Sequence, residues 1–226
     1  MLADGRVLIA GGSNGQAALD TVEAFDPATG EIALIGAMSA ARAGLSATTL
    51  LGGRVLLAGG NNGETDLATT EIYDPAAGRF LAAAEMPAAR RGQIAVRLPD
   101  NNQVLILGGT SGGRLLADAV LYVPWRDVFE PAGKLLEART AAAVTSLSGK
   151  VIVAGGRTPA AAATWTRETL TYPTIRTTDA AGVTKTDFAP GETVYIRGEN
   201  WTPGATVVLK VDEISPGSGV RWGRPR

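Results

Sequence analysis

The chain has 226 residues, of which 45% are hydrophobic, and its formal net charge is −1 at neutral pH. This length suits one large domain or two modest ones with a packed core. The near-zero charge gives no long-range attraction to nucleic acid or to an anionic membrane, so we expect neither partner. Because the chain has no cysteine and no histidine, disulfides, thiolate metal sites and histidine bases are excluded, and we expect no cofactor.

The first apolar run, GRVLIAGG, lies almost at the start of the chain. It lacks the charged region that precedes the apolar part of a signal peptide, and no apolar stretch approaches the length of a spanning helix. Later copies of this run each follow a further strand-like segment, whereas the first copy follows none. We therefore expect the chain to be a fragment of a longer protein.

Four apolar runs end in a glycine pair, at intervals of 48, 49 and 47 residues. The pairs are Gly11-Gly12, Gly59-Gly60, Gly108-Gly109 and Gly155-Gly156. A period near 50 indicates an array of similar structural units. The 29 glycines and 12 prolines favour a turn-rich β fold over a helical one. No glycine pair fits a phosphate-binding loop, so we interpret the pairs as sites of close backbone packing.

The second copy shows the strands of one unit in chain order. Residues 44–51 are small and β-favouring, and the apolar run that follows is typical of a strand buried on both faces. Residues 68–74 alternate, and a fourth strand starts near Arg79. Asn62-Gly63 and the segment from Asp74 to Gly78 supply the turns between them. A four-stranded unit that is repeated around an axis is a propeller blade.

Further positions recur in register with the glycine pairs. They are an aromatic residue, a proline two positions later, and a methionine or leucine followed four residues on by arginine. With the glycine pairs, these features resemble the kelch repeat over residues 1–172. The resemblance implies an all-β fold of four-stranded antiparallel β-propeller blades. Copy three departs from it with Val123 and Asp127 in place of the turn aspartate and glycine.

A closed kelch propeller has more blades than the roughly three and a half that this period provides. Since an open arc exposes strand edges, we expect further blades upstream and do not expect two copies to close one ring as a homodimer.

Residues 173–226 are β-like but do not continue the repeat. Their stretch DFAPGETVYIRGENWTPGATVVL resembles the first strands of a bacterial immunoglobulin-like module. We therefore predict a partial propeller at 1–172 and a partial β-sandwich at 173–226.

Arg42, Arg90 and Arg139 recur once per unit. One interpretation is that they lie on one rim and bind an anionic or glycan ligand. The other is that each one hydrogen-bonds carbonyl groups or a carboxylate between neighbouring blades. Their strict phasing with the repeat favours the second interpretation, because a ligand site does not need one copy in every unit.

Asp66, Asp118 and Glu168 lie in or near the loops after the glycine pairs, where they could touch a ligand. Trp125, Trp165 and Trp201 could stack on sugars, although Trp125 and Trp165 suit blade packing as well. No pattern supports a catalytic residue. We expect a non-enzymatic binding or scaffolding module of a larger secreted or cell-surface bacterial protein that presents propeller loops to a glycan or protein partner.

Two other functions stay open. The chain could belong to a propeller enzyme, either glycan-processing or similar to galactose oxidase, with its catalytic residues elsewhere in the protein. The copper chemistry of the oxidase type needs histidine and cysteine, which this chain lacks. A purely structural spacer is the third interpretation, because one propeller scaffold serves many functions.

Overall fold

The computed structural model describes residues 1–99, 101–147, 149–160, 163–164, 166–172, 174–178, 181, 195–199, 211–212 and 221–222. In these ranges the chain forms strands, turns and loops, and no helix. The predicted all-β fold is therefore confirmed. It follows that the same ranges hold no helix capable of crossing a membrane. The chain forms two compact units, Met1–Leu147 with Val151–Thr169, and Ser148–Lys150 with Leu170–Arg226.

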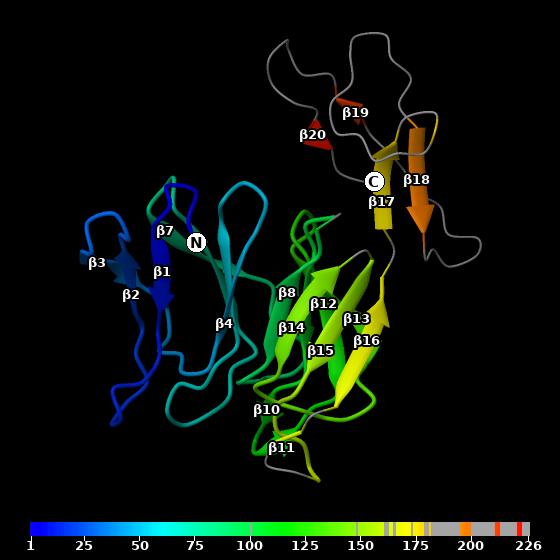
Figure 1. Ribbon diagram of the computed structural model, residues 1–226. Helices are drawn as coiled ribbons and strands as arrows, with labels where there is room; N and C mark the ends of the chain where they lie inside the picture. The colour runs from blue at the N-terminus through cyan, green and yellow to red at the C-terminus, as the bar shows by residue number, and fades with distance from the viewer. Residues whose placement is uncertain are drawn as a thin grey trace. The chain divides into compact units, whose positions relative to one another are not determined.

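Blade 2 has all four strands that its sequence predicts (Figure 1). They are β4 (Ser46–Thr49), β5 (Val55–Ala58), β6 (Thr70–Asp74) and β7 (Arg79–Ala83), paired antiparallel in that order. All four residues of β5 are buried, as the continuous apolar run indicates. Between β6 and β7, the Asp74 carboxylate accepts the N–H groups of Ala76 and Ala77 at 3.0 and 3.2 Å. This turn chemistry fixes the reversal between the two strands.

Blade 3 also has four strands, with a small hairpin inserted after its glycine pair. Its sheet contains β8 (Ile94–Arg97), β9 (Val104–Leu107), β12 (Asp118–Val123) and β13 (Val128–Lys134), and the hairpin pairs β10 (Thr110–Ser111) with β11 (Arg114–Leu115). In the β12–β13 turn, Asp127 has a left-handed φ of +50°, close to the +60° of Gly78 at the equivalent position of blade 2. Its carboxylate accepts the N–H of Ala84 at 3.0 Å and the hydroxyl of Tyr122 at 2.9 Å. These bonds explain how copy three keeps the turn without a glycine.

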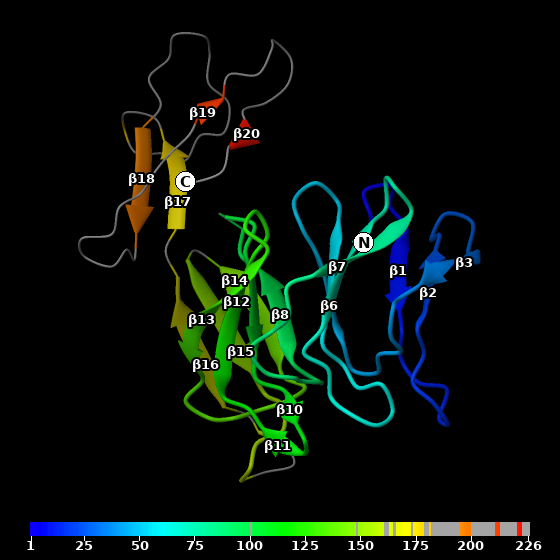
Figure 2. The same ribbon diagram turned by 180° about the vertical axis from the view of Figure 1, so that it is seen from behind.

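Blades 1 and 4 each have three strands among the described residues. Blade 1 contains β1 (Val7–Ala10), β2 (Thr21–Phe25) and β3 (Ile32–Ala37), and blade 4 contains β14 (Ala143–Leu147), β15 (Lys150–Ala154) and β16 (Arg167–Thr171). The first strands of blades 2, 3 and 4, which are β4, β8 and β14, lie next to one another (Figures 1 and 2). This is the inner position that the kelch resemblance implies for the strand ahead of the apolar run.

Successive blades pack face to face through apolar side chains. Between blades 1 and 2, Val22 and Met38 contact Val55, Leu57 and Tyr73. The junction of blades 2 and 3 is built in the same way, from Leu56, Ile72, Met86, Val104, Ile106, Val120 and Tyr122. Burying each large apolar side chain contributes about 1.5–3 kcal/mol, so these junctions are the main source of stability for the array.

Beyond blade 4, the described residues form two short antiparallel pairs. β17 (Thr174–Thr178) pairs with β18 (Tyr195–Glu199), and β19 (Val211–Asp212) pairs with β20 (Arg221–Trp222). Most of the predicted immunoglobulin-like module lies outside the described residues. That assignment therefore stays a prediction.

Candidate functional site

The glycine pairs lie where two backbone segments meet. A Cβ on Gly59 would lie 2.4 Å from the carbonyl oxygen of Arg90, closer than real Cβ atoms come. The same approach recurs at Gly11 with Arg42 and at Gly108 with Arg139, at 2.3 Å in both. The second glycine approaches the preceding crossover instead, as Gly109 does with the carbonyl oxygen of Arg91 at 2.8 Å. Close packing, and not ligand contact, accounts for the pairs.

Arg42, Arg90 and Arg139 are buried between blades. Each lies in the crossover that leads from one blade to the next, and at most 1% of its surface is exposed. The guanidinium of Arg42 donates from Nη1 to the carbonyl oxygens of Gly59 at 3.1 Å and Thr69 at 2.9 Å. Arg90 donates to Gly108 and Asp118 in the same way, and Arg139 to Gly155 and Thr166. The arginines therefore join blades and do not face a rim.

A carboxylate of the following blade completes each arginine site. Nη2 of Arg42 donates to Oε1 of Glu71 at 3.0 Å, and both side chains are buried. The same carboxylate accepts the N–H of Ser39 at 3.0 Å and its hydroxyl at 2.9 Å. A buried ion pair is tolerated when further hydrogen bonds support it, and here they engage both oxygens of the Glu71 carboxylate, while Nε of Arg42 has no hydrogen-bond partner.

Two of the three predicted loop carboxylates belong to these arginine sites. Glu168 lies in β16, accepts from Nη2 of Arg139 at 2.6 Å, and also accepts the N–H groups of Leu136 and Glu137. Asp118 begins β12 and pairs with Arg90. Protein donors therefore already engage both carboxylate oxygens of Glu168 and one of Asp118. Of the three predicted ligand contacts, Asp66 is the one that lies in a loop between strands.

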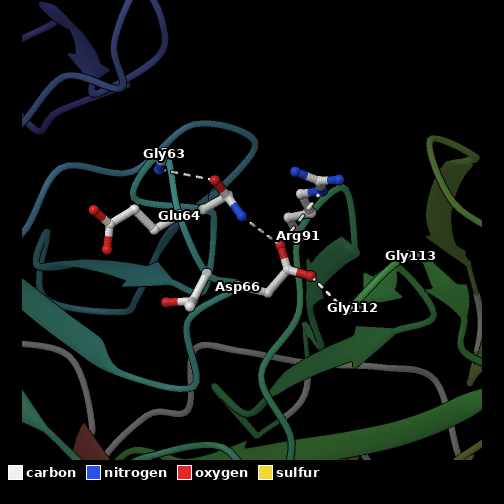
Figure 3. A pocket seen from close by; sticks show the side chains of 8 residues that line it. Gly63, Glu64, Asp66, Arg91, Gly112 and Gly113 are labelled. Carbon is white, nitrogen blue, oxygen red and sulfur yellow. Dashed lines mark hydrogen bonds and ion pairs between the residues drawn. The ribbon is translucent and has the colours of Figure 1, made fainter.

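Asp66 links the loop of blade 2 to the hairpin of blade 3 (Figure 3). Its Oδ1 accepts from the side-chain amide of Asn61 at 2.9 Å and lies 3.4 Å from Nε of Arg91. Its Oδ2 accepts the N–H of Gly112 at 2.8 Å. Both loops follow glycine pairs and lie at the same end of their sheets, the lower end in Figure 1. One largely buried carboxylate thus holds two neighbouring loops together.

These loops border an open hollow of about 370 Å³. It is lined by Asn61, Gly63, Glu64, Thr65, Asp66, Arg91, Gly112 and Gly113. Every lining residue is polar or a glycine, and about half of the Arg91 side chain is exposed. Figure 3 shows the Glu64 carboxylate and the Arg91 guanidinium on opposite sides of the residues that line the hollow. The hollow therefore offers donors at one end and acceptors at the other.

The charged pair of the hollow is not part of the repeat. β-Bridges place Asp66 opposite Asn61, and the same positions of blades 1 and 3 have Ala18 and Leu115. The residue after the crossover arginine is Arg91 here, Ala43 one blade earlier and Thr140 one blade later. The fold forms without these two charges at its other junctions. They consequently need an explanation specific to this junction.

No group of three or more carboxylates that could hold a metal ion occurs in the described ranges. Trp125 is partly buried in the β12–β13 turn, away from the residues of the hollow. Trp165 and Trp201 lie outside the described residues. The site is thus a polar hollow without an aromatic side chain in its lining.

Comparison with known families supports the repeat assignment. Residues 3–31 match the Kelch motif. The chain contains a kelch-repeat module. The matched stretch includes β1, the first glycine pair and β2, and the four-stranded antiparallel sheets of blades 2 and 3 are consistent with kelch blades. No match to a curated protein was found.

Sequence reasoning missed three residues that shape this kelch module. Glu71 lies in an alternating strand, where a charged residue is typical of a solvent-facing position, yet it is buried. From the sequence, nothing is assigned to Asn61 or Arg91. The available signal was the break in the repeat at Arg91, which becomes meaningful once the bridges define equivalent positions.

Proposed function

We propose that the kelch module is a non-enzymatic binding module whose ligand, a glycan, occupies the hollow between the loops of blades 2 and 3. The observation that carries this proposal is the Asp66–Arg91 pair. These two charges occur at positions that the neighbouring blades fill with uncharged residues, and they border the hollow. Charges that the fold does not require are best explained by what they bind.

The chemistry of the lining favours a hydroxyl-rich ligand. A volume of about 370 Å³ lies within the range of small-molecule sites. The lining has no apolar side chain that could receive the hydrophobic anchor of a protein partner. Hydroxyl groups can both donate to Glu64 and accept from Arg91. A protein partner is the alternative that the experiment below distinguishes.

The loops are ordered before a ligand arrives. Oδ1 of Asn62 accepts the N–H groups of Glu64 and Thr65 at 3.0 and 2.8 Å, and Oδ1 of Asn61 accepts the N–H of Gly63 at 2.8 Å. Because these bonds already fix the backbone, less conformational entropy is lost on binding. The hollow is therefore preorganised for recognition.

A non-enzymatic role agrees with the state of the carboxylates. Glycoside hydrolysis usually needs two carboxyl groups free to act on a substrate. At the hollow, Glu64 is exposed, but both oxygens of Asp66 are held by protein donors. The setting we propose, a larger secreted or surface bacterial protein, is supported by the resemblance of residues 173–226 to an immunoglobulin-like module.

A glycan array probed with the full chain tests this proposal. Arg91→Ala should weaken binding to any recognised glycan by roughly tenfold or more, since a charged hydrogen bond contributes about 1.5–3 kcal/mol. Arg126→Ala is the matched control, because it removes an exposed arginine that pairs with Glu130 outside the hollow. Binding that is unchanged in Arg91→Ala contradicts the site. An empty array together with Arg91-dependent capture of a protein replaces the glycan with a protein ligand.

A further inference from the structure

Blade 1 leaves one of its faces open. We call this the front face, and define it by the cross-strand rows Ile9–Glu23–Leu34 and Val7–Phe25–Ile32. The opposite face carries Val22 and Ala24, which are buried, and Val22 packs against blade 2. On the front face Ile9 is 42% exposed and Leu34 67% exposed. In Figures 1 and 2 this sheet lies at one end of the row of blades.

The same face is covered in the next blades. In blade 2 the corresponding row is Leu57–Glu71–Ala82, with Leu57 0% and Glu71 3% exposed. The side chains of Val22 and Met38, from the blade before, pack on it. Blade 3 repeats the arrangement one period later, where Val104, Ile106 and Val120 pack against side chains of blade 2. The exposed row of blade 1 is thus the surface that each later blade buries against its predecessor.

Glu23 stands where a carboxylate of an arginine site is expected. The N–H of the first glycine donates to Thr21 in blade 1, to Thr69 in blade 2 and to Thr166 in blade 4. The residues two positions after these threonines are Glu23, Glu71 and Glu168, respectively. Glu71 and Glu168 each bind a buried arginine of the preceding blade. The backbone of Glu23 pairs with β1 and β3, but among the described residues no hydrogen bond or ion pair engages its carboxylate.

The glycine pair of blade 1 also lacks the neighbouring segment that the later glycine pairs contact. In the later blades the second glycine touches the crossover of the preceding blade: Gly60 at Ala43, Gly109 at Arg91 and Gly156 at Thr140. A Cβ on Gly12 would have no neighbour within 4 Å. Gly12 nevertheless has a φ of +109°, close to that of its counterparts. The backbone is therefore already shaped for a crossover segment.

We propose that the front face of blade 1 receives a further blade of the same repeat type, and that Glu23 binds an arginine from the crossover of that blade. The row Ile9–Glu23–Leu34 is apolar except at its centre. An apolar partner would bury the Glu23 carboxylate without a cation to pair with it, which is strongly unfavourable. The occupant must therefore combine apolar side chains with one central cation. The carbonyl groups of Gly11 and Thr21 are placed to accept from that arginine, as those of Gly59 and Thr69 do from Arg42.

A second copy of this chain is a poorer occupant, because it does not offer an unpaired arginine at the centre of an apolar surface. Its crossover arginines, Arg42, Arg90 and Arg139, are each buried in a junction of their own chain. To reach Glu23 of another molecule, one of them would have to leave its junction and its own carboxylate partner, which is buried for Arg42 and Arg139. A blade whose arginine is still unpaired has no such cost.

An extended chain tests the proposal. Residues 1–50 are placed ahead of residues 3–226, because residue 51 and residue 3 are one 48-residue interval apart. The Arg42 of the added unit then precedes the original Glu23, as Arg42 precedes Glu71 in the parent chain. Glu23→Gln at the original unit should lower the midpoint of thermal unfolding by roughly 5–15 °C. The same substitution in the added unit, whose front face is open, is the matched control and should change it little.

Three results overturn the proposal. The first is an equal effect of Glu23→Gln in the two units of the extended chain. The second is limited proteolysis that removes the added unit while residues 3–226 stay intact, or an extended chain without a cooperative transition. The third comes from the parent chain. If sedimentation equilibrium shows a dimer at micromolar concentration that Glu23→Gln dissociates, a second copy covers the face instead.

Discussion

The guanidinium of Arg42 donates to Oε1 of Glu71 at 3.0 Å, although the two residues belong to successive blades and neither is exposed. The same guanidinium holds two carbonyl groups of the second blade. Three acceptors around one planar group require the fork geometry of arginine, which a lysine ammonium cannot reproduce. This relation explains why arginine recurs once in each unit of the sequence.

Removing Arg42 should strongly destabilise the array. Arg42→Ala leaves Glu71 buried without a cation, so we expect the free energy of unfolding to fall by about 3–5 kcal/mol. Arg42→Lys should recover only part of this loss, because one ammonium group cannot satisfy all three acceptors. Urea unfolding followed by intrinsic fluorescence measures both variants. The control Arg126→Ala removes an exposed pair with Glu130 and should cost about 1 kcal/mol or less. Similar losses for Arg42→Ala and the control contradict the structural role.

Gly59→Ala tests the close approach at the glycine pairs. Gly59 has a φ of +65°, and its Cβ would lie 2.4 Å from the carbonyl oxygen of Arg90. Gly78 is the matched control, since its φ is +60° and a Cβ there has no neighbour within 4 Å. Both alanines meet the left-handed penalty of about 1–2 kcal/mol. Gly59→Ala should lose more than this in chemical unfolding. Equal losses at the two positions would show that φ alone explains the glycine.

The sequence predicted the fold well because the residues that recur in each repeat are the ones whose side chains form the blades and their junctions. Apolar runs, turn residues and crossover arginines recur in register, so the strands, their order and the close glycine packing follow from periodicity. The candidate site is different. Asp66 was identified as a loop residue, and Asn61 lies in the same loop, but its other partners Arg91 and Gly112 come from two segments that only the packed blades bring next to that loop. Nothing in their sequence spacing indicates that contact.

Tyr122 should make the module sensitive to alkaline pH. Burial, and the hydrogen bond to Asp127, raise the pKa of the Tyr122 hydroxyl well above its usual value of 10. The unfolded chain loses this proton near pH 10, whereas the folded chain keeps it. Stability from this group is therefore complete below pH 10 and decreases above it, by about 1.4 kcal/mol per pH unit until the folded pKa is reached.

The variant Tyr122→Phe isolates this effect. It has no hydroxyl to titrate, so its free energy of unfolding should decrease less steeply than that of the parent between pH 10 and 11. Urea unfolding at a series of pH values gives both slopes. Parallel curves for parent and variant would rule out the predicted linkage. Below pH 9 the variant should be less stable by about 1 kcal/mol, because the bond from Tyr122 to Asp127 is lost.

At the junction of blades 2 and 3, the residues around the buried arginine differ from those at the junction of blades 1 and 2. Val120 occupies the position of Glu71, and Pro87 occupies that of Ser39, whose N–H binds the Glu71 carboxylate. Proline has no N–H to donate, and the carboxylate for Arg90 comes from Asp118, two residues earlier in the strand. The loss of the donor and the shift of the carboxylate therefore belong together.

Val120→Glu should test this coupling. The new carboxylate would be buried below Pro87 without a donor, next to an arginine already paired with Asp118, so we expect a loss of more than about 2 kcal/mol in urea unfolding. Adding Pro87→Ser and Asp118→Thr rebuilds the arrangement of Ser39, Thr69 and Glu71. Because the carboxylate then regains both a backbone donor and an unpaired arginine, the triple variant should be more stable than Val120→Glu alone. A triple variant less stable than the single one would show that the three positions act independently.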